Sequence, residues 1–151
     1  MSAPVCISPR RVEFGDCDPA RIVYYPNYFA WCDQGTHALF EQAGLSTREL
    51  ADRLGVHVPI VDAHLEFRAP ARWGDDIEIR SEVTRWGSRS LTVSHRISHK
   101  ASGEVIAEGF EARVCVRNDP ESDQIRACEV PLEVREAFGL KASPVPPEGP
   151  A

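Results

Sequence analysis

An acidic turn between residues 13 and 20 carries the residue types best suited to chemistry in this chain. The turn reads Glu-Phe-Gly-Asp-Cys-Asp-Pro-Ala, and it stands between a strand-like run and the expected start of a helix. The first backbone N–H groups of a helix have no partners within the helix and favour nearby negative charge. A carboxylate such as that of Asp18, held beside these N–H groups, suits the hydrolysis of an activated acyl group.

The three side chains in the middle of this turn have different prospects. Asp18 could attack an acyl carbonyl directly or act as a general base on water, or it could simply cap the Asp-Pro turn. Asp16 is expected to stabilise the turn through local hydrogen bonds. Cys17 has an acidic residue on each side, which disfavours the thiolate, so we expect a packing residue rather than a nucleophile.

A long helix must follow the turn. Apolar and small residues recur at helical spacing from Pro26 to Ala43, and Gly44 is a natural stop. Pro26 suits a first helical turn and Asn27 is a candidate cap. The small side chain of Gly35 would let another element approach this helix closely. A second, short helix is expected from residue 47 to 54, capped by Ser46 or Thr47.

Strands are predicted on both sides of the helices. The first covers residues 5–14, and after Pro59 the apolar period becomes two. The later strands are expected at residues 61–69, 77–84, 91–97, 110–116 and 125–130, with a helical turn at 132–138. The pattern predicts an α+β domain in which an antiparallel sheet curls over one central helix. Its open edges favour pairing of two copies.

Composition narrows the possible partners and locations. The chain has 151 residues and a formal net charge of -6, which disfavours nucleic acid as a partner. We expect a single domain over residues 1–141 and a disordered, proline-rich tail over 142–151. No signal peptide, membrane span or metal-ligand spacing is evident, and the five cysteines have no close pair in the sequence. A cytoplasmic protein without membrane contact or bound metal is therefore expected.

Residues 13–33 identify a family. The segment EFGDCDPARIVYYPNYFAWCD resembles the active-site segment of the 4-hydroxybenzoyl-CoA thioesterase family, which has the hotdog fold. Weaker likeness covers Pro-Ile-Val at 59–61, the turn at 86–90 and the segment 126–131. The resemblance implies an antiparallel sheet wrapped around one long helix and a homodimer that assembles into a homotetramer. It also implies that acyl-CoA binds at a subunit interface.

The resemblance also assigns roles to residues around the scissile bond. It implies that Asp18 is the catalytic carboxylate and that the backbone N–H of Tyr25 polarises the thioester carbonyl. An aspartate at the position of Asp33 would meet the hydroxyl of a benzoyl ring. Tyr28, with the aromatic residues near it, could wall an aryl pocket or belong to the core. Val58 stands where family members have a threonine, at the substrate.

The coenzyme end and the helix face complete the candidate site. Arg89, Ser90 and Arg126 match family positions that hold coenzyme A, whose phosphates favour arginine. Asp33, His37 and Glu41 share one helix face, and the residues alone leave open a metal site, a helix-borne catalytic acid or a polar stripe. His57, His64, His95 and His99 have no spacing typical of a catalytic or metal site, and they are interpreted as ordinary strand and loop residues.

The expected function is hydrolysis of an acyl-CoA, of benzoyl or 4-hydroxybenzoyl type, to the free acid and CoA without a cofactor. One alternative is a short- or branched-chain acyl-CoA thioesterase. Another is a non-catalytic acyl-CoA-binding protein, because Arg21 replaces a glycine of the family turn and lacks glycine's backbone freedom. A hotdog lyase would place a histidine near the helix start, where this chain has tyrosines and Asn27.

Overall fold

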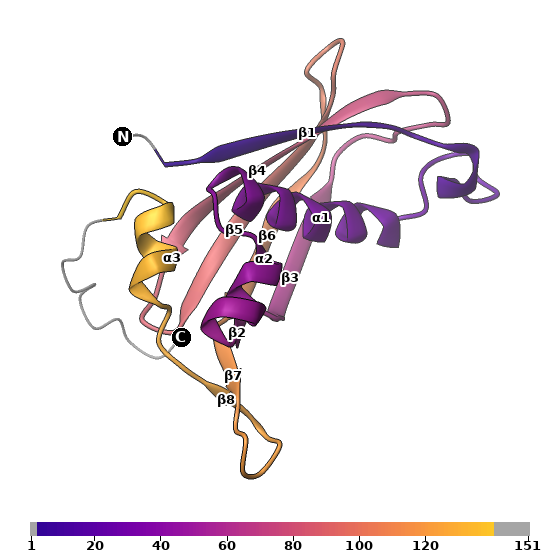
Figure 1. Cartoon of the computed structure of the whole chain (residues 1–151). Coiled ribbons are helices and arrows are strands. Elements are labelled where there is room, and N and C mark those ends of the chain that lie inside the picture. Colours follow the sequence, from indigo (N-terminus) through magenta and orange to yellow (C-terminus); the bar gives the residue numbers. More distant parts are fainter. Residues whose placement is uncertain (1–2, 141–151) are drawn as a thin grey trace.

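A five-stranded antiparallel sheet and one long helix form the main body of the molecule (Figure 1). The computed structural model describes residues 3–140, so the predicted tail at 142–151 lies outside the described part. In order across the sheet, the strands are β1 (Val5–Arg11), β4 (Asp76–Trp86), β5 (Ser90–His99), β6 (Val105–Val114) and β3 (Ile60–Phe67). This arrangement confirms the predicted α+β architecture and the hotdog fold.

The helix α1 (Pro26–Gln42) begins and ends close to the predicted residues. Gly44 stops it with a φ of 90°, a left-handed conformation that glycine adopts without steric cost. The prediction that Asn27 caps the helix is wrong. Tyr25 occupies the N-cap, and the Asn27 side chain instead donates a hydrogen bond of 2.8 Å to the carbonyl of Asp16. The helix start is thus tied to the acidic turn.

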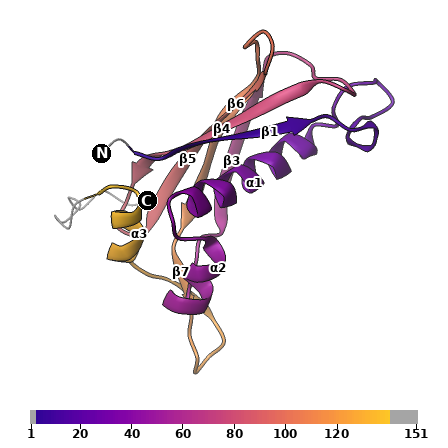
Figure 2. The ribbon, with the colours of Figure 1, turned by 45° about the horizontal axis from the view of Figure 1, so that its top comes forward.

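One face of the sheet carries α1 along its length (Figure 2). Two apolar clusters fill the space between them. Tyr28, Trp31 and Cys32 belong to the cluster near the start of the helix, while Leu39 and Phe40 belong to the cluster near its end. Several buried polar side chains lie between these two clusters, beside the middle of the helix. Gly35 allows the close approach, since a Cβ at this position would lie 2.5 Å from the Ser81 hydroxyl.

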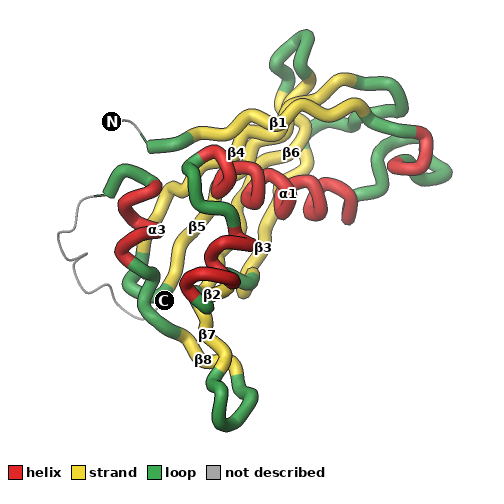
Figure 3. Tube along the Cα trace, viewed as in Figure 1, coloured by secondary structure: helices red, strands yellow, loops and turns green. Residues whose placement is uncertain are grey.

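A smaller sheet and three short helical segments cover the remaining edges (Figure 3). The sheet contains β2 (Val56–His57), β7 (Val116–Asn118) and β8 (Ile125–Ala127), and the helical segments are η1 (Phe14–Asp16), α2 (Thr47–Glu49) continuing into η2 (Leu50–Leu54), and α3 (Leu132–Ala137). Of the two residues predicted to cap α2, Ser46 is the cap, since its hydroxyl accepts a hydrogen bond from the Glu49 N–H.

The face of strand β6 that points toward the helix is not the predicted one. The apolar alternation of Phe110, Ala112 and Val114 predicted that these residues face the core, whereas Glu111 and Arg113 are the buried ones, each 3% exposed. The two charged side chains pair with one another, which removes the cost of burying either alone. The strand also ends at Val114, before β7 begins at Val116.

Two other strand predictions also need correction. The first strand ends at Arg11 rather than at residue 14, because η1 takes up the following residues. In β3, the alternation of Val61, Ala63, Leu65 and Phe67 predicted a buried face, yet only Leu65 is buried. This strand lies at the edge of the sheet, with no further strand beside it in the described part of the chain.

Candidate active site

The acidic turn folds back on itself at the N-terminal end of α1 (Figure 3). An isolated antiparallel bridge pairs Cys17 with Val23, and the Tyr24 N–H donates to the Asp16 carbonyl over 2.8 Å. The Asp16 carboxylate accepts a 2.8 Å hydrogen bond from the Glu13 N–H, which closes the preceding turn. Asp16 therefore has the structural contact predicted for it. The folded turn also sets residues 16–18 beside 22–24, immediately before Tyr25.

Asp18 lines an open cleft of about 570 Å³. The other residues around the cleft are Phe14, Gly15, Cys17, Pro19, Arg21 and Trp73. One carboxylate oxygen of Asp18 accepts a 2.8 Å hydrogen bond from the Ala20 N–H, and no described residue forms an ion pair with it. The side chain thus makes the local turn contact of an Asp-Pro sequence and still faces the cleft. The aromatic rings of Phe14 and Trp73 add an apolar wall, with centroids 5.5 Å apart.

The turn forms although Arg21 stands where the resemblance implies a glycine. Arg21 adopts a φ of 64°, in the left-handed region, and its N–H donates to the Asp18 carbonyl over 2.8 Å. A side chain other than glycine pays a steric penalty in this conformation. Arg21 therefore reproduces the glycine-type turn at a cost and also lines the cleft of Asp18.

The start of α1 leaves one donor without a partner next to this turn. The Asn27 N–H donates to the Tyr24 carbonyl, the Tyr28 N–H donates to the Tyr25 carbonyl, and Pro26 has no N–H. Within residues 3–140, the N–H of Tyr25 donates to no other residue. Such an unpaired N–H at a helix start suits an oxygen atom that carries negative charge.

Tyr28, for which the sequence left open a place in the wall of an aryl pocket or in the core, lies in the core. Its side chain is 4% exposed, and its ring lies 5.4 Å from that of Trp31, centroid to centroid. Burial raises the pKa of the Tyr28 hydroxyl to about 12. The rings of Tyr24 and Tyr25 are the exposed ones, and Tyr25 packs edge-on against Phe67 of β3. The exposed aromatic rings at the helix start are thus those of the neighbours of Tyr28.

Val58 lies at a second cavity, of about 600 Å³, between α2, the smaller sheet and β6. This cavity is lined by apolar side chains, including Leu50, Val58 and Val116, and by polar ones, with His37 and Arg113 among them. Asp33 stands beside it on α1, with 43% of its side chain exposed. The Asp33 carboxylate lies 2.7 Å from Arg113 and 3.5 Å from His37. Asp33 and His37 therefore meet as the shared helix face predicted.

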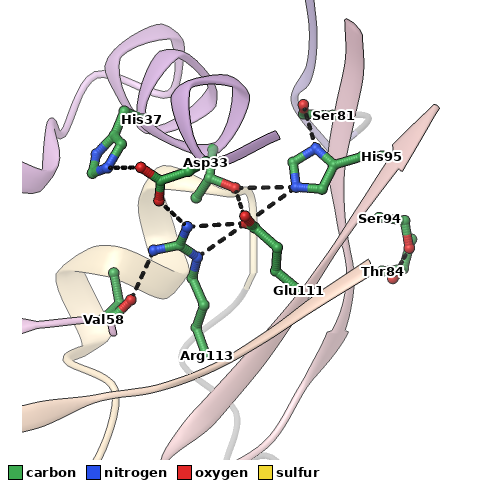
Figure 4. A network of polar contacts seen from close by, with 10 residues as sticks. Asp33, His37, Val58, Ser81, Thr84, Ser94, His95, Glu111 and Arg113 are labelled. Atoms are coloured by element: carbon green, nitrogen blue, oxygen red, sulfur yellow. Dashed lines mark hydrogen bonds and ion pairs between the residues drawn. The ribbon is translucent and has the colours of Figure 1, made fainter. Parts of the chain in front are cut away.

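A buried polar network joins Asp33 to the centre of the sheet (Figure 4). Arg113 donates to both Asp33 and Glu111, and Glu111 lies 3.1 Å from His95 and accepts a 2.6 Å hydrogen bond from Thr36. His95 also bonds to the Ser81 hydroxyl over 2.8 Å. The interpretation of His95 as an ordinary strand residue was incomplete. The available signal was a charged pair, two residues apart, within an apolar strand.

The three residues predicted at the coenzyme lie in two parts of the fold, Arg89 and Ser90 at the start of β5 and Arg126 in the smaller sheet. Arg89 is exposed in the turn between β4 and β5, and its carbonyl accepts a hydrogen bond from the Cys115 N–H. Ser90 begins β5. Arg126, in β8, pairs with Asp119 at 3.3 Å and keeps 68% of its side chain exposed. Both arginines are thus on the surface, where phosphates could reach them.

The described residues hold neither a metal-binding cluster nor a membrane-spanning helix. Across residues 3–140, no group of three histidine, cysteine, aspartate or glutamate side chains is arranged to hold a metal ion. None of the helices in that range has the length and apolar character needed to cross a membrane.

Comparison with known proteins matches this geometry to one family. The model of the thioesterase-like superfamily matches residues 12–148. The chain is 34% identical to a 4-hydroxybenzoyl-CoA thioesterase from a Pseudomonas species, over 82% of this chain and 90% of the relative. It is 33% identical to a 1,4-dihydroxy-2-naphthoyl-CoA hydrolase from Synechococcus elongatus, over 72% of this chain and 79% of that relative.

Solved structures give the same result. An Asp-to-Asn mutant of 4-hydroxybenzoyl-CoA thioesterase, in complex with 4-hydroxybenzoyl-CoA, matches with a TM-score of 0.82 and 33% identity, covering 90% of this chain and 99% of that one. A gentisyl-coenzyme A thioesterase matches with a TM-score of 0.75 and 35% identity, covering 86% and 99% of the two chains. The chain therefore belongs to the thioesterase-like superfamily, within the 4-hydroxybenzoyl-CoA thioesterase family that its acidic turn resembles.

Proposed function

We propose that the protein hydrolyses aromatic acyl-CoA thioesters to the free acid and coenzyme A. The observation that carries this proposal is the position of Asp18. Its carboxylate lines an open cleft, without an ion-pair partner among the described residues, beside a helix start whose Tyr25 N–H is unpaired. A carboxylate in a cleft and an N–H donor at the adjoining helix start are the two groups that thioester hydrolysis needs most.

Asp18 and Tyr25 divide the chemistry between them in this proposal. The Asp18 carboxylate either attacks the thioester carbonyl or removes a proton from an attacking water. In the first route the C–S bond breaks, coenzyme A leaves as the thiolate, and water then hydrolyses the mixed anhydride. In both routes negative charge develops on the carbonyl oxygen, and the Tyr25 N–H stabilises it together with the helix dipole. These groups suffice without a metal or redox cofactor, and coenzyme A is part of the substrate.

An aromatic acyl group is supported by the relatives and by the residues near the cleft. The relatives named above act on hydroxybenzoyl-, dihydroxynaphthoyl- and gentisyl-CoA by their names. Exposed rings of Tyr24, Tyr25, Phe14 and Trp73 offer flat apolar contact beside the turn. We propose that Asp33 meets a ring hydroxyl, with Val58 as part of the wall around the ring. Tyr28, in the core, would support the exposed aromatic rings at the helix start.

The coenzyme would be held by surface cations at the edge of the sheet. We propose that Arg89, Ser90 and Arg126 bind its phosphates, since a guanidinium pairs with phosphate through two N–H groups. Arg126 would exchange its exposed contact with Asp119 for the phosphate. An ion pair this exposed contributes little stability, so little free energy is lost in the exchange.

A second copy of the chain would complete the site. Tyr25 and Asp33 are eight residues apart on α1, a distance of about 12 Å along the helix axis, which is too long for one aryl ring to bridge. We propose that the partner subunit supplies Asp33 and that the copies pair along β3, where Ile60, Val61 and Phe67 are 40%, 65% and 49% exposed. Pairing of two dimers into a homotetramer, a single domain over residues 1–141 and a cytoplasmic location are also part of this proposal.

A panel of acyl-CoAs, scored by release of the free thiol, tests the proposed function. It should contain 4-hydroxybenzoyl-, benzoyl-, 1,4-dihydroxy-2-naphthoyl-, isobutyryl- and hexanoyl-CoA. We expect hydrolysis of the aryl esters with the highest kcat/KM. A preference for the aliphatic esters would replace the aromatic assignment by the short- or branched-chain alternative. Tight binding of every ester without thiol release would identify a non-catalytic acyl-CoA-binding protein.

A further inference from the structure

Arg113 is the most densely bonded charged side chain of the candidate site, and the proposed mechanism does not use it. It reaches from β6 toward α1 and is 3% exposed. Its guanidinium donates over 2.9 Å to the Val58 carbonyl, over 2.7 Å to Asp33, and over 3.0 and 3.2 Å to one oxygen of Glu111. A single planar group therefore links the sheet, the Val58 segment and the helix (Figure 4).

Glu111 holds Arg113 from the side of the sheet. Burial acts to raise the pKa of Glu111, but the hydrogen bonds and charges of His95, Thr36 and Arg113 outweigh it, so the pKa lies below its ordinary value. The ionised Glu111 thus has a partner on every side, from α1, β5 and β6. Because Glu111 cannot move without breaking these bonds, the guanidinium of Arg113 is held in one position.

Asp33 is fixed by this guanidinium at the border of the cavity. One of its oxygens lies 2.7 Å from Arg113, and the other lies 3.5 Å from His37. An aspartate side chain on an exposed helix face would otherwise sample several rotamers. Held by Arg113, which lines this cavity together with Val58, the Asp33 carboxylate keeps lone pairs that can accept a further hydrogen bond.

The Asp33 carboxylate selects what this site accepts. Its position is fixed by Arg113, which Glu111 holds in turn. A hydroxyl group on the acyl group would find a carboxylate acceptor of fixed direction. A site built to bond a hydroxyl rejects the analogue without one, because its polar groups are then left unpaired.

We propose that Arg113 is a positioning residue that holds Asp33 in place and makes the enzyme selective for acyl groups bearing a hydroxyl group. The inference rests on the proposed thioesterase function and deepens it. Arg113 touches no reacting atom in this account. Its effect passes through Asp33, so it should appear in the discrimination between substrates rather than in the chemical step.

The test compares Arg113→Lys with the parent enzyme on 4-hydroxybenzoyl-CoA and benzoyl-CoA, two esters that differ only in the hydroxyl group. Lysine keeps the charge beside Glu111 but lacks the planar fork with which Arg113 spans Asp33, the Val58 carbonyl and Glu111. We expect the ratio of kcat/KM for the two esters to fall by about tenfold, through a higher KM for the hydroxylated ester, with benzoyl-CoA changed by less than about twofold. Arg96→Lys, on the exposed face of β5, is the matched control and should leave the ratio unchanged.

Two further variants separate positioning from a general structural effect. In an Asp33→Ala background, Arg113→Lys should not change the ratio again, because the group it positions is absent. Glu111→Gln keeps the size and hydrogen bonding of the side chain but loosens the hold on Arg113, and it should lower the ratio as well. It replaces the lysine variant in the test if Arg113→Lys does not fold.

Equal losses on both esters, or an unchanged ratio in Arg113→Lys and Glu111→Gln, would overturn the inference. A parent enzyme that hydrolyses both esters equally well would also overturn it while leaving the proposed function intact. Failure of the parent enzyme to release thiol from any ester would instead remove the proposed function itself.

Discussion

Arg21 shows how one residue can preserve a turn that its type disfavours. The sequence predicted that the loop could not rely on glycine's backbone freedom here, and the structure places Arg21 in the left-handed region with the turn intact. The bond from its N–H to the Asp18 carbonyl is made by the backbone, so it does not depend on the side chain. The steric penalty therefore destabilises the turn without changing the geometry around Asp18.

The conformation of Arg21 predicts an unusual order of stability between two variants. Arg21→Gly should be more stable than Arg21→Ala by about 1 kcal/mol, because only glycine relieves the left-handed strain. The free energy of unfolding in urea measures the difference. At Arg48, in α2, the order should reverse because alanine favours a helix. An alanine variant as stable as the glycine variant at position 21 would show that no strain is present.

Glu111 predicts how stability depends on pH. Its pKa is lowered from an ordinary value of 4.5, so its contribution to folding is complete above pH 4.5 and is lost as the pH falls through the lowered value. Glu111→Gln should therefore cost about 2 kcal/mol at pH 7, and this deficit should shrink below pH 4.5. Urea unfolding between pH 7 and pH 3 measures it, with the exposed Glu41→Gln as control. A deficit that grows on acidification would contradict the assignment.

At the scale of elements, the accuracy of the sequence-based prediction depended on where each element packs. The helix α1 and strands β4 and β5 were predicted well because each has one face of apolar or small residues against the core. In β6, the pairing of Glu111 with Arg113 reverses the rule that charged residues face solvent. That pairing depends on Thr36, His95 and Asp33, which lie in other elements, so the strand's own pattern could not reveal it.

The two edge strands of the sheet give a prediction about assembly. Val61 of β3 is 65% exposed, and Val61→Lys should reduce the mass in sedimentation from that of the assembly to that of a monomer, because a charge at an edge blocks pairing. Thioesterase activity should fall with it. Ile7→Lys, on the opposite edge strand β1, is the control, since Ile7 is similarly exposed at 54%. Equal masses for the two variants would argue against pairing along β3.

The candidate site depends on contacts between residues that are far apart in the sequence. The turn with Asp18 was predicted because its residues are contiguous, while the cleft also needs Trp73, which is distant in sequence. Asp33 was predicted from the helix, but its partner Arg113 lies 80 residues further along the chain. Contacts of this length are set by the order of strands in the sheet, which the spacing of apolar residues does not specify.

If the Asp18 carboxylate carries out the hydrolysis, a single substitution should abolish most of it. Asp18→Asn keeps the size of the side chain and its acceptor for the Ala20 N–H but removes the charge. We expect kcat for thiol release from 4-hydroxybenzoyl-CoA to fall by at least about a hundredfold, with substrate binding retained. The exposed Asp52→Asn variant should keep the parent rate. An Asp18→Asn enzyme that releases thiol at the parent rate would contradict the account.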